Sequence, residues 1–430
     1  MSTCIQKEHS VESAVAGISA DRRSLVSLIA RLRSPSGQAN PFPLYHELRE
    51  RGDVVRAPWG AHLLTGYEVC EQVHRNGRTW LVPDAAWRAR NGAGSFRWNA
   101  PSVQGLVKTL AWLNAPEHTR QRRSLGNVFG RGAIDALRPF VEATVERLLD
   151  TLAERLREEG EADFVPLVSE ELPVATLGHW MGIPAGDHAL LRELMHALEP
   201  AQELLPTKSE LESAAVGMTG LRDYFTAFVR DRRRHPGDDP VSRWMRTWDE
   251  IEPDREAADE NLYNLAMFLT IASLETSSTT LSVMVSLLAR DRDRWQWLRA
   301  HPAHVPDAVE EVLRYDPAIH VSTRVAAEPT VIGGVPVEKD EMVHVLLGSA
   351  NHDPRRYPDP DTFDIHRKAS HLSFGVGPHY CLGAALGRLQ TTSLLTGLLR
   401  RFPRLGVGAE PVFAPRVAFR RLMELKVVHE

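Results

Sequence analysis

The chain has few cysteines and none of the usual export signals. Its three cysteines, Cys4, Cys70 and Cys381, are odd in number and far apart. They form no disulfide framework, so they indicate a reducing compartment. Residues Met1 to Asn40 are polar and mixed in charge, without the apolar stretch of a signal peptide. We therefore expect a cytoplasmic protein with no membrane anchor, in which residues 1–40 are a partly disordered leader.

A strong charge excess, internal repeats and low-complexity tracts are missing as well. The formal net charge is only −5, which gives no reason to expect nucleic acid as a partner. No linker divides the 430 residues, and a hydrophobic content of 43% is enough for a large core. We expect residues 1–430 to form a single domain.

One apolar run, Leu265 to Ala289, is long enough to be mistaken for a membrane span. It contains a single charged residue, Glu275, near its centre. A membrane helix would carry that charge at a cost of about 3 kcal/mol. Because the run is also rich in Ser and Thr, it predicts a long helix through a water-soluble core.

Periodicity predicts a mainly helical chain with a small β-rich lobe. The expected helices are Pro43–Arg51, Pro116–Phe129, Arg138–Glu158, Leu211–Arg234, Ala257–Ala289, Ala308–Tyr315 and Leu382–Phe402. The expected strands lie within Val54–Thr65 and Arg324–Leu347, where Gly333-Gly334 indicates a hairpin turn. Pro236 to Pro240 predicts a surface turn, and Trp80 to Trp112 shows no regular pattern.

The segment from Phe374 to Gly383 carries the most chemical information. It reads Phe-Gly-Val-Gly-Pro-His-Tyr-Cys-Leu-Gly, and so many glycines with a proline predict a tight loop. The loop places Cys381 just before a helix, where backbone N–H groups and the helix dipole favour a thiolate. With no second cysteine or histidine at metal-finger spacing, this sulfur suits a single axial ligand to haem iron. The alternative is a small buried cysteine with a packing role.

The pattern Phe-x-x-Gly-x-x-x-Cys-x-Gly resembles the haem-binding loop of the cytochrome P450 family, the haem-thiolate monooxygenases. The resemblance extends from about residue 40 to the C-terminus. It implies haem b held between a long central helix and the cysteine loop, with Cys381 on the iron. Phe374, Gly375, His379 and Gly383 are then haem-binding residues, and His379 matches the bacterial form of the loop.

Glu275 and Thr276 on the long helix match the family's acid–alcohol pair. Reduction of O₂ consumes protons, which a hydroxyl can position and a carboxylate can relay. The chain has Ser273 where the family most often has Gly, and a hydroxyl there can bend a helix. The alternative is a threonine bonded to its own backbone beside an ion-paired glutamate.

Glu311 and Arg314 match the family's Glu-x-x-Arg motif. Residues three apart share a helix face, so an ordinary surface ion pair is the alternative. Their position, followed by a β segment and then the cysteine loop, favours a buried charge network that supports the loop.

The two haem propionates require cationic partners. The resemblance implies His118 and Arg122, one turn apart on one helix, together with Arg324 and His379. Arginine suits carboxylates through its planar fork of donors. Solvated surface charge is the alternative for each.

Segments that match the family's substrate pocket contain Ala272, Ile319, His320, Val321 and Phe419. The tryptophan-rich region from Trp80 to Trp112 is the expected roof of that pocket, with core packing as the alternative. The pocket should be mainly apolar with a few polar anchors.

The chain lacks flavin, nicotinamide and iron–sulfur signatures, so electrons must come from a separate ferredoxin and ferredoxin reductase. Arg120, Arg123, Arg131 and Arg388 are candidates for a basic docking patch. The predicted activity is insertion of one oxygen atom from O₂ into a small organic molecule of secondary metabolism. Radical coupling, ring formation or desaturation stays open, whereas a non-catalytic recruitment module or a peroxide-driven enzyme would be expected to lack the acid–alcohol pair.

Overall fold

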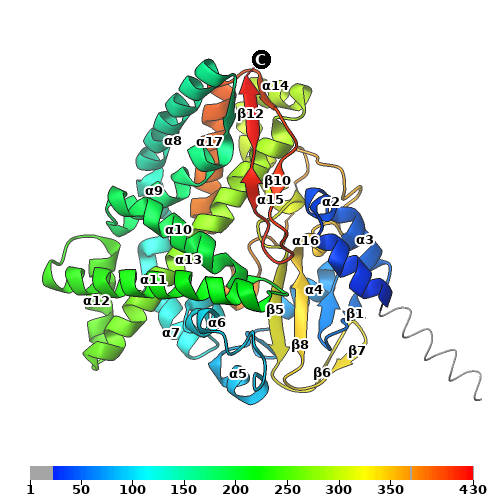
Figure 1. The fold of residues 1–430 in the computed structure, drawn as a ribbon, viewed down its shortest axis with the longest axis vertical. Helices are drawn as coiled ribbons and strands as arrows, with labels where there is room; N and C mark the ends of the chain where they lie inside the picture. Colours follow the sequence, from blue (N-terminus) through cyan, green and yellow to red (C-terminus); the bar gives the residue numbers. More distant parts are fainter. Residues whose placement is uncertain (1–22, 369, 430) are drawn as a thin grey trace, which may run out of the picture.

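Helix α13 (Arg255–Leu288) is the longest of the described helices and runs through the middle of the helical part (Figure 1). The structure is a computed structural model that describes residues 23–368 and 370–429. The Asp254 carboxylate accepts the first free N–H groups of α13 and so fixes its start. By length and composition α13 could cross a membrane, but 72% of its most apolar window is buried in the protein. The predicted core helix is therefore confirmed.

The other labelled helices precede and follow α13 in the chain. They are α2 (Pro35–Ala39), α3 (Phe42–Arg49), α4 (Tyr67–Arg75), α5 (Ala85–Asn91), α6 (Pro101–Leu106), α7 (Glu117–Ser124), α8 (Arg131–Glu159), α9 (Glu171–Met181), α10 (His188–Leu198), α11 (Lys208–Arg234), α12 (Pro240–Ile251), α14 (Arg292–Ala300), α15 (Val305–Tyr315), α16 (Leu347–Ala350) and α17 (Ala384–Arg401). Short tighter or wider turns are η1 (Leu110–Trp112), η2 (Gly126–Phe129), η3 (Val165–Ser169), η4 (Ala185–Asp187), η5 (Glu199–Gln202), η6 (Pro302–His304) and η7 (Gly377–His379). Residues 236–239 of the predicted surface turn lie between α11 and α12, and Pro240 begins α12.

The strands form one larger sheet and three small ones. They are β1 (Val54–Arg56), β2 (His62–Leu64), β3 (Trp80–Leu81), β4 (Glu161–Asp163), β5 (Val321–Ala326), β6 (Thr330–Ile332), β7 (Val335–Val337), β8 (Met342–Leu346), β9 (Leu405–Val407), β10 (Val412–Phe413), β11 (Leu422–Glu424) and β12 (Lys426–His429). The larger sheet has the order β1-β2-β8-β5-β3, with β2 and β8 parallel and the other neighbours antiparallel. Gly333 and Gly334 connect β6 to β7 with φ values of 55° and 78°, which confirms the predicted hairpin turn.

The helices and the sheet occupy different sides of the molecule. Helices α8 to α13 and α17 gather on one side, and the larger sheet with α2 to α4 lies on the other (Figure 1). One continuous apolar core joins α8, α9, α11, α13 and α17. Smaller clusters fill the spaces under α3 and under α4 against the sheet. The predicted architecture, mainly α with a small β-rich lobe, is confirmed.

Part of the predicted leader is ordered, because residues 23–32 form a helix that is followed by α2. Leu25, Leu28 and Leu32 of that first helix are buried with spacings of one turn, which is the pattern of a core-facing helix. Residues 1–22 lie outside the described part of the chain.

The expectation of an irregular segment is wrong for residues 80–112, which contain β3, α5, α6 and η1. Trp87 meets the ring of Trp98 edge to face at 5.4 Å, and Trp98 meets Trp112 at 6.3 Å. These three rings pack against one another and toward the core, as the packing alternative predicts, whereas Phe96 is 55% exposed.

Candidate active site

The cysteine loop is held by glycines in conformations that other residues rarely adopt. Gly375 and Gly377 have φ values of 65° and 74°. A Cβ on Gly377 would lie 2.4 Å from the carbonyl oxygen of His74, so a larger residue cannot fit. The N–H of Cys381 donates to the carbonyl of Phe374 at 2.8 Å and closes the loop just before α17. The loop geometry predicted around Cys381 is therefore present.

Burial raises the pKa of the Cys381 thiol above its ordinary value, and the Gly383 N–H, Arg122 and Arg388 act in the opposite direction. The helix N-terminus thus favours the thiolate as predicted, but burial outweighs it. A bound metal cation would supply the positive charge that this sulfur otherwise lacks. A single, half-buried thiol in this loop fits an axial ligand of haem iron.

Buried and half-buried nitrogen donors gather beside the loop. The rings of His118 and His379 are 4.1 Å apart, and Arg122 donates to the Tyr380 carbonyl at 2.7 Å. Arg324 is 8% exposed, and its guanidinium donates to the carbonyl of its neighbour Thr323 at 2.8 Å. The structure therefore brings together the four predicted propionate partners.

These donors have no acidic partner among the described ion pairs. Burial, followed by Arg122 and Arg324, lowers the pKa of His118 to about 4. Burial and Arg324 lower the pKa of His379 to about 2, and burial lowers that of Arg324 to about 10. Buried cations without counter-charge are costly. Two carboxylates of a bound group would relieve that cost, so the cluster fits the haem propionates.

His74 of α4 also belongs to this donor cluster, and sequence reasoning missed it. It is 6% exposed, and its Nε2 lies 2.8 Å from the Ser322 hydroxyl. Burial and Arg324 lower its pKa well below the ordinary value. A lone histidine far from every motif gives no local signal, and only the packing of α4 against the cysteine loop reveals it.

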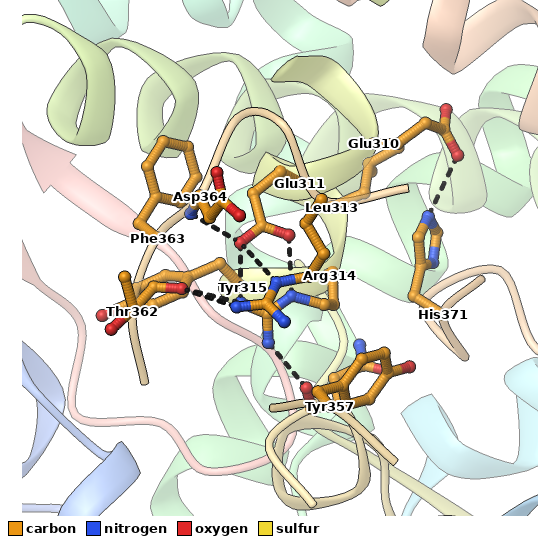
Figure 2. Close-up of polar contacts among 12 residues, drawn as sticks. Glu310, Glu311, Leu313, Arg314, Tyr315, Tyr357, Thr362, Phe363, Asp364 and His371 are labelled. Carbon is orange, nitrogen blue, oxygen red and sulfur yellow. Dashed lines mark hydrogen bonds and ion pairs between the residues drawn. The ribbon is translucent and has the colours of Figure 1, made fainter. Parts of the chain in front are cut away.

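Glu311 and Arg314 form a buried bidentate ion pair on α15. Arg314 Nε and one terminal nitrogen lie 2.8 Å from the two carboxylate oxygens, and both side chains are 1% exposed (Figure 2). Arg314 also donates to the Asn351 carbonyl at 2.8 Å. Glu311 further accepts from the N–H of Asp364 at 2.9 Å and pairs with Arg367 at 3.4 Å. This geometry differs from that of a surface ion pair, because Glu311 and Arg314 both find all these partners in the protein interior.

Asn351 connects that ion pair to the cysteine loop. Its side chain donates to the Ser373 hydroxyl at 2.9 Å and accepts the N–H of Leu372 at 2.9 Å. The Ser373 hydroxyl in turn donates to the Leu313 carbonyl at 2.6 Å. The hydrogen-bonded path thus leads from α15 to the residue directly before Phe374.

On α13, the side chains of Thr276 and Glu275 point in different directions. The Thr276 hydroxyl donates to the Ala272 carbonyl at 2.6 Å, one turn earlier. The Ser273 hydroxyl makes the same kind of bond to Leu269 at 2.5 Å. Glu275 is 7% exposed and lies among Glu199, Thr279 and Arg421. No described hydrogen bond joins Glu275 to Thr276, so the acid side of the predicted pair reaches an interior charge cluster.

The electrostatics of Glu275 favour its neutral form. Burial and the negative charge of Glu199 raise its pKa well above the ordinary glutamate value. Burial alone would raise the pKa of Glu199 as well, but a hydrogen bond from Glu275 and the charges of Arg416 and Arg421 lower it. Glu275 is therefore the acid of this pair whose neutral form the surroundings favour, and Glu199 the one whose ionised form they favour. Glu199 lies far from the motifs and was not identified in the sequence.

The five predicted substrate residues differ in their surroundings. Ala272 is exposed in the middle of the otherwise buried helix α13, which leaves it accessible to a ligand. Ile319 and Phe419 are half-buried and pair through an isolated β-bridge. These three are compatible with a pocket wall.

His320 and Val321 do not fit the prediction. His320 is 1% exposed, and its ring nitrogens bond to the Tyr45 hydroxyl at 2.9 Å and to Asp316 at 3.0 Å. Val321 is 5% exposed and packs in the apolar cluster under α3. His320 is thus occupied by interior polar partners and Val321 by core contacts, and neither is free to contact a substrate.

The predicted basic patch is partly neutralised. Arg120 pairs with Glu252 at 2.6 Å, and Arg388 pairs with Glu310 at 2.6 Å. Arg123 is exposed, and Arg131 is 97% exposed, with Asp135 no closer than 3.9 Å. Of these four arginines, only Arg123 and Arg131 present the exposed positive charge that a basic docking patch requires.

A loop cysteine, a buried cluster of propionate-type donors and a long acid-bearing helix define the haem-thiolate class of proteins. The family model for cytochrome P450 matches residues 303–405, which include the ion pair and the cysteine loop. The 6-deoxyerythronolide B hydroxylase of Saccharopolyspora erythraea is 30% identical over 407 residues, covering 93% of this chain and 97% of that protein. The chain belongs to the cytochrome P450 family.

Solved structures of the family share the fold. P450BioI, in complex with hexadec-9Z-enoic acid ligated acyl carrier protein, superposes with a TM-score of 0.83 at 27% identity, covering 92% of this chain and 100% of that one. CxnD, a cytochrome P450 for C–S bond formation in chuangxinmycin biosynthesis, gives a TM-score of 0.77 at 31% identity, covering 90% and 94%. The protein is accordingly an oxidoreductase, a cytochrome P450 monooxygenase with a haem-thiolate iron cofactor.

Proposed function

We propose that this cytochrome P450 hydroxylates or epoxidises a small organic molecule of secondary metabolism, using haem b in the cytoplasm. The carrying observation is the cluster of His74, His118, Arg122, Arg324 and His379, which has no described acidic partner and lies beside the Cys381 loop. The similarity of the chain to 6-deoxyerythronolide B hydroxylase supports hydroxylation as the reaction. Haem activates O₂ when bound, and the side chains described here bind the haem and supply protons.

Each group has a defined task in this proposal. Arg122, Arg324 and the neighbouring histidines bind the propionates, and Cys381 ligates the iron. The Thr276 hydroxyl donates to the Ala272 carbonyl, and it can leave this acceptor in order to donate to another one. Glu275 holds a proton at its carboxyl group in a buried site and delivers it during O₂ reduction. Glu311 and Arg314 position the cysteine loop through Asn351.

Electrons come from a ferredoxin and its reductase in this proposal, and an acidic ferredoxin would dock near Arg123 and Arg131. Reconstitution with an acidic ferredoxin tests this surface. A slower rate of haem reduction for Arg123→Glu at low salt, together with a rate for the unchanged protein that falls as salt is added, would support it. An unchanged rate would place the docking surface elsewhere.

Optical titration tests the substrate class. Purified ferric protein is titrated with macrolide, other polyketide, peptide, terpene and carrier-linked acyl compounds. Displacement of water from the iron by a bound ligand converts the haem from low to high spin. A saturating shift with one class identifies it, and product analysis then gives its oxygen content. The absence of any shift across the secondary-metabolite panel would contradict the proposed substrate class.

A second outcome on the same haem is bond formation without oxygen insertion. The similarity to an enzyme of C–S bond formation supports keeping it as a candidate. Mass analysis of the product separates the two reactions, since hydroxylation or epoxidation adds one oxygen atom and coupling adds none.

A further inference from the structure

Glu275 belongs to a cluster of charged side chains from distant parts of the chain. Glu170 lies just before α9, His196 on α10 and Glu199 at the start of η5, and Arg416 and Arg421 come from the C-terminal segment. One ring nitrogen of His196 and one carboxylate oxygen each of Glu199 and Glu275 lie within 4.8 Å of one another. His196 Nε2 is also 3.0 Å from Glu170.

One oxygen atom in this cluster has no hydrogen-bond partner among the described residues as long as Glu275 is ionised. Glu199 Oε2 accepts from both Arg416 and Arg421, and the Glu199 side chain is only 2% exposed. Its other oxygen, Oε1, is buried, and no described donor bonds to it while Glu275 is ionised. Two ionised carboxylates cannot bond to each other, but a protonated Glu275 can donate to Glu199. The unpaired oxygen therefore marks a place for the Glu275 proton.

The charges of this cluster cancel only if Glu275 and His196 share one proton. Arg416 and Arg421 offset two carboxylates, those of Glu170 and Glu199. Neutrality then requires either a protonated Glu275 with a neutral His196 or an ionised Glu275 with a protonated His196. A divalent cation among the same three donors would face two guanidinium groups, whose repulsion opposes it. The geometry consequently favours a proton site over a metal site.

We propose that His196 reloads Glu275 with protons, while Glu199 accepts the hydrogen bond that holds the proton on Glu275. The inference rests on the proposed function, in which Glu275 delivers protons for O₂ reduction. In each cycle one proton moves from the imidazolium of His196 to the Glu275 carboxylate, leaving a neutral ring and a neutral acid. When Glu275 next gives up its proton, solvent reprotonates His196, whose side chain is 33% exposed.

The position of His196 suits that task. Histidine is the side chain that exchanges protons near neutral pH. The charged groups facing it are Glu170 ahead of α9, Glu199 of η5, Glu275 of α13, and Arg421 of the C-terminal segment. Arg192, one turn earlier on α10, is paired with Glu171. His196 is thus the half-exposed member of a group whose other end, Glu275, is buried.

The test uses the haem-loaded protein with its redox partners and the substrate found by titration. His196→Gln keeps a hydrogen bond to Glu170 but cannot carry a proton, and His196→Asn repeats the test if Gln folds poorly. The matched control is His235→Gln, an exposed histidine 3.2 Å from Asp231. We expect about tenfold slower turnover and a larger solvent isotope effect for His196→Gln. This loss of rate is smaller than the full contribution of general acid–base catalysis.

A second measurement does not depend on turnover. The infrared band of the protonated Glu275 carboxyl group is assigned by its loss in Glu275→Gln. On transfer to D₂O this band shifts at the rate of proton exchange, which should fall about tenfold in His196→Gln and stay unchanged in His235→Gln. In Glu199→Gln the band should move, because the acceptor of its hydrogen bond has changed.

The outcomes separate the two ideas. Wild-type turnover of Glu275→Gln would refute the proton-delivery role and, with it, the part of His196. Slow turnover of Glu275→Gln, with His196→Gln matching the His235→Gln control in turnover and in exchange rate, would overturn only the inference about His196. Slow exchange and slow turnover in His196→Gln alone would support it.

Discussion

Replacing Arg314 by alanine removes the cation at the centre of the buried network shown in Figure 2. Glu311 then keeps only Arg367, at 3.4 Å, and the Asp364 N–H as partners, while remaining 1% exposed. Removing one partner of a buried ion pair costs about 3–5 kcal/mol. The Asn351 carbonyl also loses a donor at 2.8 Å, which adds about 1–3 kcal/mol. Partial compensation by Arg367 leaves about 3–5 kcal/mol as the expected loss.

Such a loss is large beside a total stability of about 5–15 kcal/mol. In urea, with a slope of about 3 kcal/mol per molar, the unfolding midpoint should fall by about 1 M or more. The same variant should also lose haem, because Asn351 connects Arg314 to Ser373 beside the cysteine loop. Haem content and the urea midpoint are measured on the same purified sample.

Arg138→Ala is the matched control, because Arg138 and Asp135 have the same spacing at 3.5 Å but are 49% and 53% exposed. An exposed pair contributes about 0–1 kcal/mol, so its midpoint should hardly move. If Arg314→Ala shifts the midpoint no more than Arg138→Ala and keeps its haem, the interior network does not stabilise the fold or the loop. That result would refute the reasoning.

Four further outcomes follow from the site. Cys381→Ala should abolish the long-wavelength carbon monoxide band of the reduced protein, whereas Cys70→Ala, at a thiol that donates to the Leu64 carbonyl, should keep it; a normal band in the first variant would exclude Cys381 as the ligand. Thr276→Ala should keep haem and consume reduced cofactor while hydrogen peroxide replaces product, and wild-type coupling would argue for another proton route. Arg324→Leu should weaken haem retention about tenfold or more, as expected for losing a charge-assisted bond of about 1.5–3 kcal/mol to a propionate, and undiminished retention would show that the guanidinium does not bind the haem. Glu275 has a raised pKa, so the folded state binds more protons than the unfolded state above about pH 4.3, and stability falls with rising pH in that window. The stability of Glu275→Gln should lack this contribution to the fall with rising pH. Parallel curves of stability against pH for the two proteins would contradict the raised pKa of Glu275.

The loop and the ion pair could be predicted because their residues are neighbours in the sequence. The glycines around Cys381 are the residues that tolerate the positive φ values observed there. Glu311 and Arg314 are three apart on one helix, which brings their side chains together wherever that helix packs. Local spacing determines both arrangements, and their burial followed from the position of α15 in the chain.

The other members of the site depend on tertiary contacts that leave no pattern in the chain. His74 comes near Arg324 through the packing of α4, 248 positions before its partner Ser322. Glu199 meets Glu275 through η5 and α13, two elements that sequence alone does not align. His320 shows the opposite error, because it precedes a pocket-type strand but its ring lies between Tyr45 and Asp316.

Arg420 has a consequence for how the chain reaches its folded state during synthesis. Its guanidinium forms a bidentate pair with Asp316 at 3.0 Å and donates to the Gln38 carbonyl at 2.5 Å, a contact spanning 382 positions. On the ribosome, Gln38 and Asp316 are therefore both made long before the cation that binds them. Until residue 420 emerges, the buried carboxylate has only His320 and the segment around α2 lacks this anchor. The early helices should consequently remain sensitive to protease in nascent chains that stop before residue 420 and become protected in chains that pass it.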